Sequence, residues 1–405
     1  MPIEVGLNYA RKILAGVRLK PANRMKEIPP SSTLKVLSLA KELEHQGKKI
    51  IHMEVGEPDF DTPEHVKKAA RDALAQGLTK YTPSLGTPEL RNAITEHLKE
   101  KGIETEMKNV IVTPGAKHAI FCAMVATLDP GDEVIIPSPC WTYEAMVRIV
   151  GAKPIFIETT RENEFKIEPE KVEEALTSRT KMLLLNYPNN PTGAVMTEEE
   201  LRPIADLASD RGLWVLSDEI YDSLVYEGKN ASILSIPEMA ERTIYVNGLS
   251  KTYSMTGWRL GYAVAPIELI SEMNKIQQAS TSCAASFVQA AGVTALRGPQ
   301  DFIEKMREEF RKRRDEIVKR LNSIDGIDCP KPGGAFYAFP SIKDLDISSL
   351  EFCELLLQKA GVASVPGSGF GPYGEGHVRF SYATSMKNIK EATEKIKEVV
   401  EELHK

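Results

Sequence analysis

The chain has 405 residues, of which 42% are hydrophobic and 27% are charged, and its formal net charge is −6. This length exceeds what one simple core supports and predicts two domains. The acidic balance argues against a nucleic acid as partner. The five cysteines are scattered without CxxC spacing. That pattern predicts neither a disulfide framework nor a metal site, and it is typical of a protein in the reducing cytoplasm.

The first 28 residues combine basic residues with apolar residues at helical spacing. They lack the continuous apolar run of a secretory signal. We expect an N-terminal arm with a short amphipathic helix that packs on the body or on a partner subunit; an organelle transit peptide is the alternative. The longest apolar run of the chain, Ala119–Leu128, is too short for the ~20 residues that a bilayer requires, so no membrane partner is expected.

The middle of the chain alternates apolar, β-rich runs with helical patterns such as Glu198–Arg211. Continuous apolar strands separated by helices predict a mostly parallel sheet that is buried on both faces. Seven such runs occur, at Val110–Val112, Val134–Ile136, Ile155–Ile157, Met182–Leu185, Leu213–Leu216, Thr243–Val246 and Leu260–Val264.

The last third has a different pattern. A long charged helix is expected over Asp301–Leu321, strands over Ala335–Phe339 and Val378–Tyr382, and a closing helix over Asn388–Leu403. This mixture predicts a smaller α+β domain, whose boundary falls where Gly298 and a proline interrupt the helices. We expect three parts: an arm over 1–28, a small domain over 29–64 and 298–405, and a large domain over 65–297.

One lysine, Lys251, follows the expected strand Thr243–Val246, and Arg259 lies eight residues beyond it. Open α/β sheets place their ligands at the carboxyl ends of such strands. A desolvated lysine amine loses basicity and can form a Schiff base, and an arginine suits a phosphate. The pair therefore suggests pyridoxal phosphate (PLP). A surface lysine after a strand is the structural alternative.

Polar side chains also follow two neighbouring strands. Asp218 comes after Leu213–Leu216, where a helix cap or an ion pair would explain it structurally. Functionally, its carboxylate would keep the pyridine nitrogen of PLP protonated, which the cofactor needs as an electron sink. Tyr221 and Asn190, the latter in a rigid proline-rich turn, are candidate donors to the phenolate oxygen of PLP.

Two further strand ends fit the same cofactor. Gly115, Ala116 and Lys117 begin a helix after Val110–Val112, where backbone amides and the helix dipole favour a phosphate. Trp141 follows Val134–Ile136, and a tryptophan in that position can stack on a flat heterocycle.

With these motifs in order, the chain resembles a class I/II aminotransferase of PLP fold type I, in the aspartate aminotransferase subgroup. The resemblance runs from about Pro29 to the end. The motifs are VGEPDFDTP from Val55, KYTPSLGTPELR from Lys80, TPGAKHA from Thr113, SPCW from Ser138, NYPNNPTG from Asn186, SDEIY from Ser217, LSKTYSMTGWRLGY from Leu249 and VRFSYA from Val378.

The resemblance implies catalytic roles for Lys251 as the Schiff-base lysine, for Asp218 and for Tyr221. It implies that Arg379 clamps the substrate α-carboxylate, a bidentate task suited to a guanidinium. Gly56, Trp141 and Asn190 join it at the substrate. The implied cofactor-binding set is Gly115, Ala116, Lys117, Trp141, Asn190, Asp218, Tyr221, Lys251, Arg259 and Tyr81.

Tyr81 matches a tyrosine that reaches the phosphate of the neighbouring subunit, so the resemblance implies a homodimer with shared active sites. One position departs from the family pattern. Many members have a serine three residues before the lysine, whereas this chain has Gly248 there. Ser250 is a candidate to replace its hydroxyl.

The implied activity is ping-pong transfer of an amino group between an L-amino acid and a 2-oxo acid, with aspartate and 2-oxoglutarate favoured. Aromatic or alanine specificity is the alternative within the family. A PLP-dependent C–S lyase and a non-enzymatic regulator are further alternatives, and the regulator would carry a DNA-binding domain that the short leader cannot supply.

Overall fold

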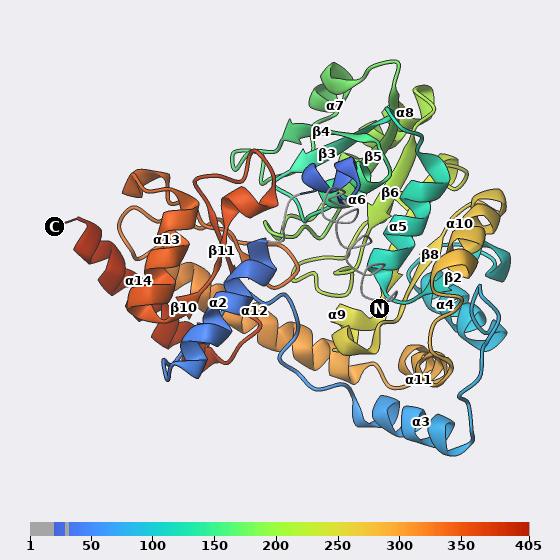
Figure 1. The fold of residues 1–405 in the computed structure, drawn as a ribbon, viewed down its shortest axis with the longest axis horizontal. Helices are drawn as coiled ribbons and strands as arrows, with labels where there is room; N and C mark the ends of the chain where they lie inside the picture. Colours follow the sequence, from blue (N-terminus) through green and yellow to red (C-terminus); the bar gives the residue numbers. More distant parts are fainter. Residues whose placement is uncertain (1–19, 29–31, 405) are drawn as a thin grey trace, which may run out of the picture.

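The computed structural model describes residues 20–28 and 32–404 (Figure 1). The amphipathic helix expected within 1–28 therefore lies largely outside the described residues. The part of the arm that is described holds one 3-10 turn, η1 (Asn23–Lys26).

A seven-stranded sheet forms the centre of the larger part of the molecule, in the order β2-β8-β7-β6-β5-β3-β4. Its strands are β2 (Val110–Thr113), β3 (Glu133–Ser138), β4 (Lys153–Glu158), β5 (Thr180–Asn186), β6 (Trp214–Asp218), β7 (Thr243–Gly248) and β8 (Gly261–Val264). β8 runs antiparallel to both of its neighbours, and the other pairs are parallel. The mostly parallel seven-stranded sheet and all seven of its expected strands are confirmed.

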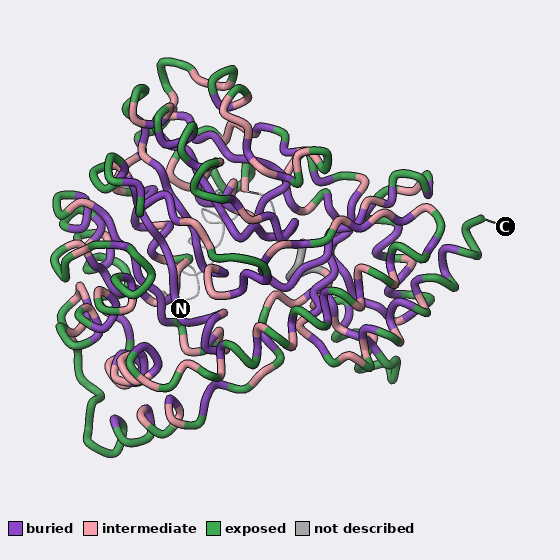
Figure 2. Tube along the Cα trace, turned by 180° about the vertical axis from the view of Figure 1, so that it is seen from behind, coloured by how far each residue is buried: buried purple, intermediate pink, exposed green. Residues whose placement is uncertain are grey.

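Helices cover both faces of this sheet because successive strand residues point to opposite sides. Val134 and Ile136 pack with α5 (Ala116–Thr127) and α10 (Ile267–Ser280) on one face. Ile135 between them packs on the other face with α8 (Glu198–Asp210). Towards β2 and β8, that second face is covered by α4 (Pro88–Glu100) and α11 (Ser286–Arg297). Figure 2 shows the buried residues running along the strands, with exposed residues on the outer turns of the helices.

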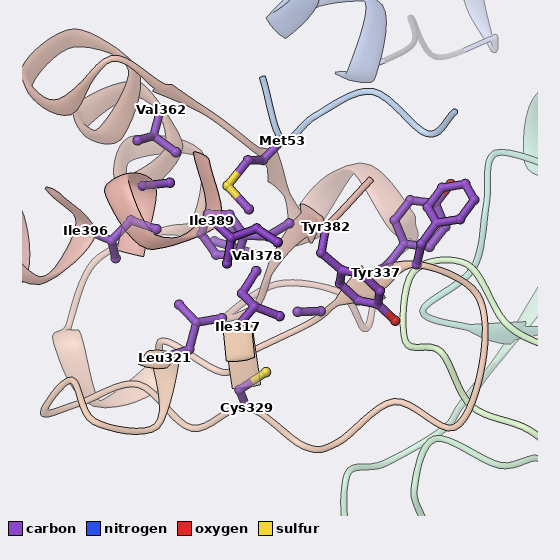
Figure 3. Packing of buried hydrophobic residues seen from close by; sticks show 14 of the residues in the cluster. Met53, Ile317, Leu321, Cys329, Tyr337, Val362, Val378, Tyr382, Ile389 and Ile396 are labelled. Carbon is purple, nitrogen blue, oxygen red and sulfur yellow. The ribbon is translucent and has the colours of Figure 1, made fainter. Parts of the chain in front are cut away.

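The smaller part of the molecule has its own apolar core, built from α12 (Asp301–Leu321), α14 (Met386–Leu403) and short strands (Figure 3). Its three-stranded sheet has the order β11 (Val365–Pro366), β12 (Val378–Ser381) and β9 (Tyr337–Ala338). A two-residue strand near the start of the chain, β1 (Ile51–His52), pairs in parallel with β10 (Val362–Ala363). The helices α2 (Ser32–His45) and α13 (Ser349–Leu355) flank these strands.

Three expectations for this smaller part need correction at their ends. The strand expected over Val378–Tyr382 ends one residue earlier, at Ser381. The strand expected over Ala335–Phe339 contains only Tyr337–Ala338, because Ala335 has a left-handed backbone (φ 56°) that cannot belong to a strand. The closing helix begins at Met386, two residues before its expected start, because the Ser385 side chain accepts a hydrogen bond from the Asn388 amide and caps it.

Among the helices of the described chain, none combines the length and the apolar character needed to cross a bilayer.

Candidate active site

A cavity of about 1160 Å³ lies at the carboxyl ends of the parallel strands, where the two parts of the molecule meet. Residues at or just after the ends of β3, β5, β6 and β7 line this cavity. The lining includes Trp141 after β3, Asn186 at the end of β5 with Asn190 after it, Asp218 at the end of β6 with Tyr221 after it, Ser250 and Lys251 after β7, and Tyr337, Phe370 and Arg379 from the smaller part. The position is the one that the sequence predicts for a ligand.

Lys251 is held in the short helix α9 (Leu249–Thr252), directly after β7. Its Nζ donates a hydrogen bond to the Gly56 carbonyl at 2.5 Å. Burial lowers the pKa of Lys251 to about 8, and the positive charges of Arg379 and Arg259 act in the same direction. A substantial fraction of this amine is therefore neutral near pH 8, as a nucleophile or a base requires.

Asp218 is the last residue of β6, and only 4% of it is exposed. Its Oδ2 accepts a hydrogen bond from the Tyr143 hydroxyl at 2.7 Å, and its Oδ1 accepts one from the Ile220 amide at 3.2 Å. Burial raises the pKa of Asp218 to about 6. A buried carboxylate of this kind stabilises a cation placed against it, such as a protonated ring nitrogen.

Tyr221 donates or accepts a 2.7 Å hydrogen bond with the hydroxyl of Tyr337, and both rings are buried. Burial raises the pKa of Tyr221 well above its usual value. The phenol therefore stays protonated and can donate a hydrogen bond to an anionic oxygen in the cavity.

Arg379 is 2% exposed and lies between two aromatic rings, 4.5 Å from the centroid of Tyr337 and 5.0 Å from that of Phe370. Its Nη1 donates to Asn190 Oδ1 at 3.0 Å, and its Nη2 donates to the Glu54 carbonyl. Its Nε has no partner among the residues that the structure describes. The guanidinium is therefore fixed in place with donors left over, which suits a carboxylate.

Two glycines bring the residues of the expected phosphate cradle together. Gly115 precedes α5 with a left-handed backbone (φ 88°), and a Cβ there would collide with the Arg259 guanidinium. A Cβ at Gly261 would collide with the Ala116 amide. Arg259 itself has a left-handed backbone (φ 55°), and its Nη1 donates to the Thr256 carbonyl at 2.9 Å. The start of α5 and Arg259 thus form one positive concavity for an anion.

Lys117 and Trp141 lie on the same side of the cavity. The Lys117 Nζ is 4.5 Å from the centroid of the Trp141 ring. Burial lowers the pKa of Lys117, and the charge of Arg259 adds to this effect. Both residues line the cavity, as the sequence predicts.

The close approach of two strands explains why a glycine occupies position 248. A Cβ there would lie 2.9 Å from the Leu260 carbonyl oxygen and 3.1 Å from the Gly261 Cα. Because β7 and β8 are adjacent at this point, a serine would require the backbone to shift. Ser250 is 7% exposed and lines the cavity, so it supplies a hydroxyl in this segment.

The remaining predicted residues have mixed outcomes. Ala116 and Gly56 line the cavity. The Gly56 carbonyl also accepts a hydrogen bond from Lys251, a contact that the sequence did not predict. Tyr81 is 89% exposed and does not line the cavity of its own chain.

Sequence reasoning missed three buried residues of the site: Tyr143, Tyr337 and Glu54. Tyr143 stands two residues after Trp141 in the same strand-end loop, and that position was a usable signal. Tyr337 and Glu54 come from segments far from the lysine motif, and only the fold places Tyr337 against Tyr221 and Glu54 against Arg379.

The site fits a flat aromatic aldehyde that carries a phosphate. It offers a buried amine, a carboxylate beside it, a phenol donor, an indole face and an anion cradle whose close packing depends on two glycines. Within the described chain, no cluster of histidine, cysteine, aspartate and glutamate side chains has the arrangement of a metal site.

Comparisons with known proteins point to one family of enzymes. The family model for aminotransferase class I and II matches residues 48–396. The chain is 46% identical to an aspartate aminotransferase of Rhizobium meliloti (strain 1021), over 93% of this chain and 95% of that protein. It is 43% identical to aromatic-amino-acid aminotransferase 2 of Thermococcus litoralis, over 94% of this chain and 98% of that protein. The crystal structure of the aspartate aminotransferase from Rhizobium meliloti superposes with a TM-score of 0.91, at 44% identity, over 95% of this chain and 99% of that one.

Proposed function

The chain belongs to the class I and II aminotransferases, and from that premise we propose that it moves an amino group between L-aspartate and 2-oxoglutarate by a ping-pong reaction. Its cofactor is pyridoxal 5′-phosphate, which the family uses, and its fold is PLP fold type I. The observation that carries the proposal is the meeting of a buried amine, a buried carboxylate and a buried guanidinium in one cavity.

We assign the cofactor-binding roles as follows. Lys251 is the amine that attaches to the cofactor aldehyde, and Asp218 faces the ring nitrogen. Tyr221 and Asn190 serve the phenolate oxygen, while Trp141 lies against the ring. The phosphate takes the cradle of Gly115, Ala116, Lys117 and Arg259. The cradle geometry and the pKa shifts of Lys251 and Asp218 support these roles.

When bound, the cofactor ring supplies an electron sink for bonds broken at the substrate Cα. The protein then has three tasks of its own. Arg379 orients the substrate through its α-carboxylate, with Gly56 beside it. Lys251, with a pKa of about 8, takes the proton from Cα and would deliver it to the aldehyde-derived carbon C4′ of the cofactor. Asp218 holds the positive charge of the ring in place.

Aspartate is favoured because relatives bearing that name match at 42–46% identity over nearly the whole chain. The Thermococcus litoralis relative makes aromatic amino acids the second candidate. Mixing the PLP-bound protein with single amino acids tests the choice, because conversion to the pyridoxamine form changes the absorbance. We expect aspartate to react faster than phenylalanine or alanine. Comparable rates for phenylalanine would reverse the assignment, and release of sulfide from cysteine without a 2-oxo acid would favour a lyase.

We also propose a homodimer with shared sites, in which Tyr81 reaches the phosphate of the partner. The 89% exposure of Tyr81 in the single chain supports this. Most residues of the apolar core around α12 and α14 come from 29–64 and 298–405, which supports the division into a small domain over these ranges and a large domain over 65–297. The five free cysteine thiols support a reducing compartment, the cytoplasm.

A further inference from the structure

Glu54 is a fully buried carboxylate that lies beside the proposed substrate site. Its side chain has no exposure, and its Oε1 accepts a hydrogen bond from His52 Nδ1 at 2.7 Å. Its Oε2 has no hydrogen-bond partner among the described residues. A buried carboxylate oxygen without a partner is costly, so its presence calls for a physical explanation.

Arg379 is joined to Glu54 in two ways. The Arg379 Nη2 donates to the Glu54 backbone carbonyl, which brings the two residues into direct contact. The negative charge of the Glu54 side chain also acts on the guanidinium and raises its pKa, against the larger lowering effect of burial. The other groups with this raising effect are the phenols of Tyr337 and Tyr221, so Glu54 is the carboxylate among them.

His52 offsets the charge of Glu54. Its Nε2 lies 3.1 Å from Glu44 Oε1 on α2, so the ring bridges two carboxylates. The hydrogen bond to Glu54 is the largest cause that raises the pKa of His52 to about 9, against burial, which lowers it. The strand paired with β1 contributes only Val362 and Ala363 at this point, which carry no charge. His52 is therefore a cation at neutral pH.

We propose that Glu54 and His52 together set how strongly Arg379 binds a carboxylate. Glu54 competes with the substrate for the positive charge of Arg379, and His52 limits that competition while it is protonated. The inference rests on the proposed role of Arg379 as the α-carboxylate site. It adds two positioning residues that act through Arg379 without touching the substrate.

The direction of the pH effect follows from these charges. Below the pKa of His52 the imidazolium neutralises Glu54, and Arg379 attracts the carboxylate fully. Above about pH 9 the imidazole is neutral, Glu54 is left uncompensated, and carboxylate binding weakens. The chain thus loses carboxylate affinity in alkaline solution through a group outside the cavity.

The test uses Glu54→Gln, which keeps the shape and the acceptor for His52 but removes the charge. The dissociation constant of succinate is read from the absorbance of the PLP-bound protein at about pH 7 and about pH 10. In the wild type, we expect the Glu54–His52 pair to lower the affinity for succinate by roughly fivefold between these pH values. Glu54→Gln should lack this loss. Any titration at the cofactor is common to both proteins, so the ratio of their dissociation constants is the readout.

Two further variants complete the cycle. His52→Asn is expected to bind succinate more weakly already at neutral pH, and Glu54→Gln in the same chain is expected to restore binding. Glu391→Gln removes a partly buried carboxylate paired with the exposed Lys49 in the same part of the fold, so it serves as the matched control with unchanged binding. A purely structural role would not produce this rescue, and KM should move while kcat stays nearly constant.

The outcomes separate the inference from its premise. If Arg379→Ala abolishes succinate binding but Glu54→Gln follows the wild type at both pH values, the inference is wrong and the carboxylate site stands. If Arg379→Ala leaves binding unchanged, the proposed carboxylate site is wrong, and the inference falls with it.

Discussion

At the scale of single residues, burial shifts the pKa values of one base and one acid towards neutral pH. It lowers the pKa of Lys251 to about 8 and raises that of Asp218 to about 6. In water the two values lie more than about six units apart, and in the cavity the gap narrows to about two. The same apolar surroundings therefore make the lysine a weaker base and the aspartate a weaker acid, which suits proton transfer at neutral pH.

Removing the Lys251 amine should remove the chemistry. Lys251→Ala is expected to lower kcat at least about a thousandfold, because both the attachment point and the general base are lost. The absorbance band of the lysine-bound cofactor should disappear as well. Lys275→Ala, at an exposed lysine paired with Glu272, is the control and should retain full turnover. Turnover of Lys251→Ala at the wild-type rate would contradict the role of Lys251 as attachment point and general base.

The lowered pKa of Lys251 has a direct kinetic consequence. Only the neutral amine attacks the cofactor aldehyde, and it becomes neutral as pH rises through about 8. The rate at which cofactor-free protein attaches PLP should therefore rise with pH and level off above that value. Stopped-flow absorbance over a pH series measures it. A rate that keeps rising to the pKa of an ordinary lysine would show that the amine is not desolvated.

The sequence predicted most of the residues that meet in the cavity, because each follows an apolar strand that could be recognised alone. Lys251, Asp218 and Trp141 are of this kind. Tyr337 was not predicted as a site residue, although its strand was expected, because its hydroxyl reaches Tyr221 from a segment 116 residues away in the chain.

At the scale of elements, the site depends on the close approach of β8 to the start of α5. A Cβ at Gly261 would collide with the Ala116 amide, whereas one at Gly257 meets nothing within 4 Å. Gly261→Ala should therefore destabilise the protein by about 1–3 kcal/mol and weaken PLP binding, because it pushes α5 away from Arg259. Thermal unfolding and cofactor titration measure both effects, with Gly257→Ala as the matched control. Equal behaviour of the two variants would contradict the expected collision.

The strands of the large sheet and the long helix α12 were predictable, whereas three of the shortest strands were not. The seven strands of the large sheet and the helix α12 (Asp301–Leu321) have patterns long enough to be recognised. The strands β1, β10 and β11 have two residues each and exist only because tertiary contacts pair them. A pattern of alternation needs more residues than these strands contain.

At the scale of the whole molecule, the proposed dimer can be tested by complementation. Lys251→Ala and Tyr81→Ala should each be poorly active alone, the second because it weakens PLP binding. If the sites are shared, a mixed dimer carries both defects in one site and none in the other. Unfolding and refolding an equal mixture should then recover about one quarter of wild-type activity. No recovery above the two separate variants would mean that Tyr81 serves its own chain or no site.

The parallel pairing of β1 with β10 has a consequence for biosynthesis. β1 lies near the start of the described chain, and its partner lies near its end, with the whole seven-stranded sheet between them. A ribosome therefore releases every strand of that sheet before it releases the partner of β1. The large sheet can assemble while residues 51 and 52 wait unpaired, and such long-range pairing is slow. Glu54 and Gly56 follow β1 directly in the chain. The substrate side of the cavity is therefore completed only after translation has nearly finished.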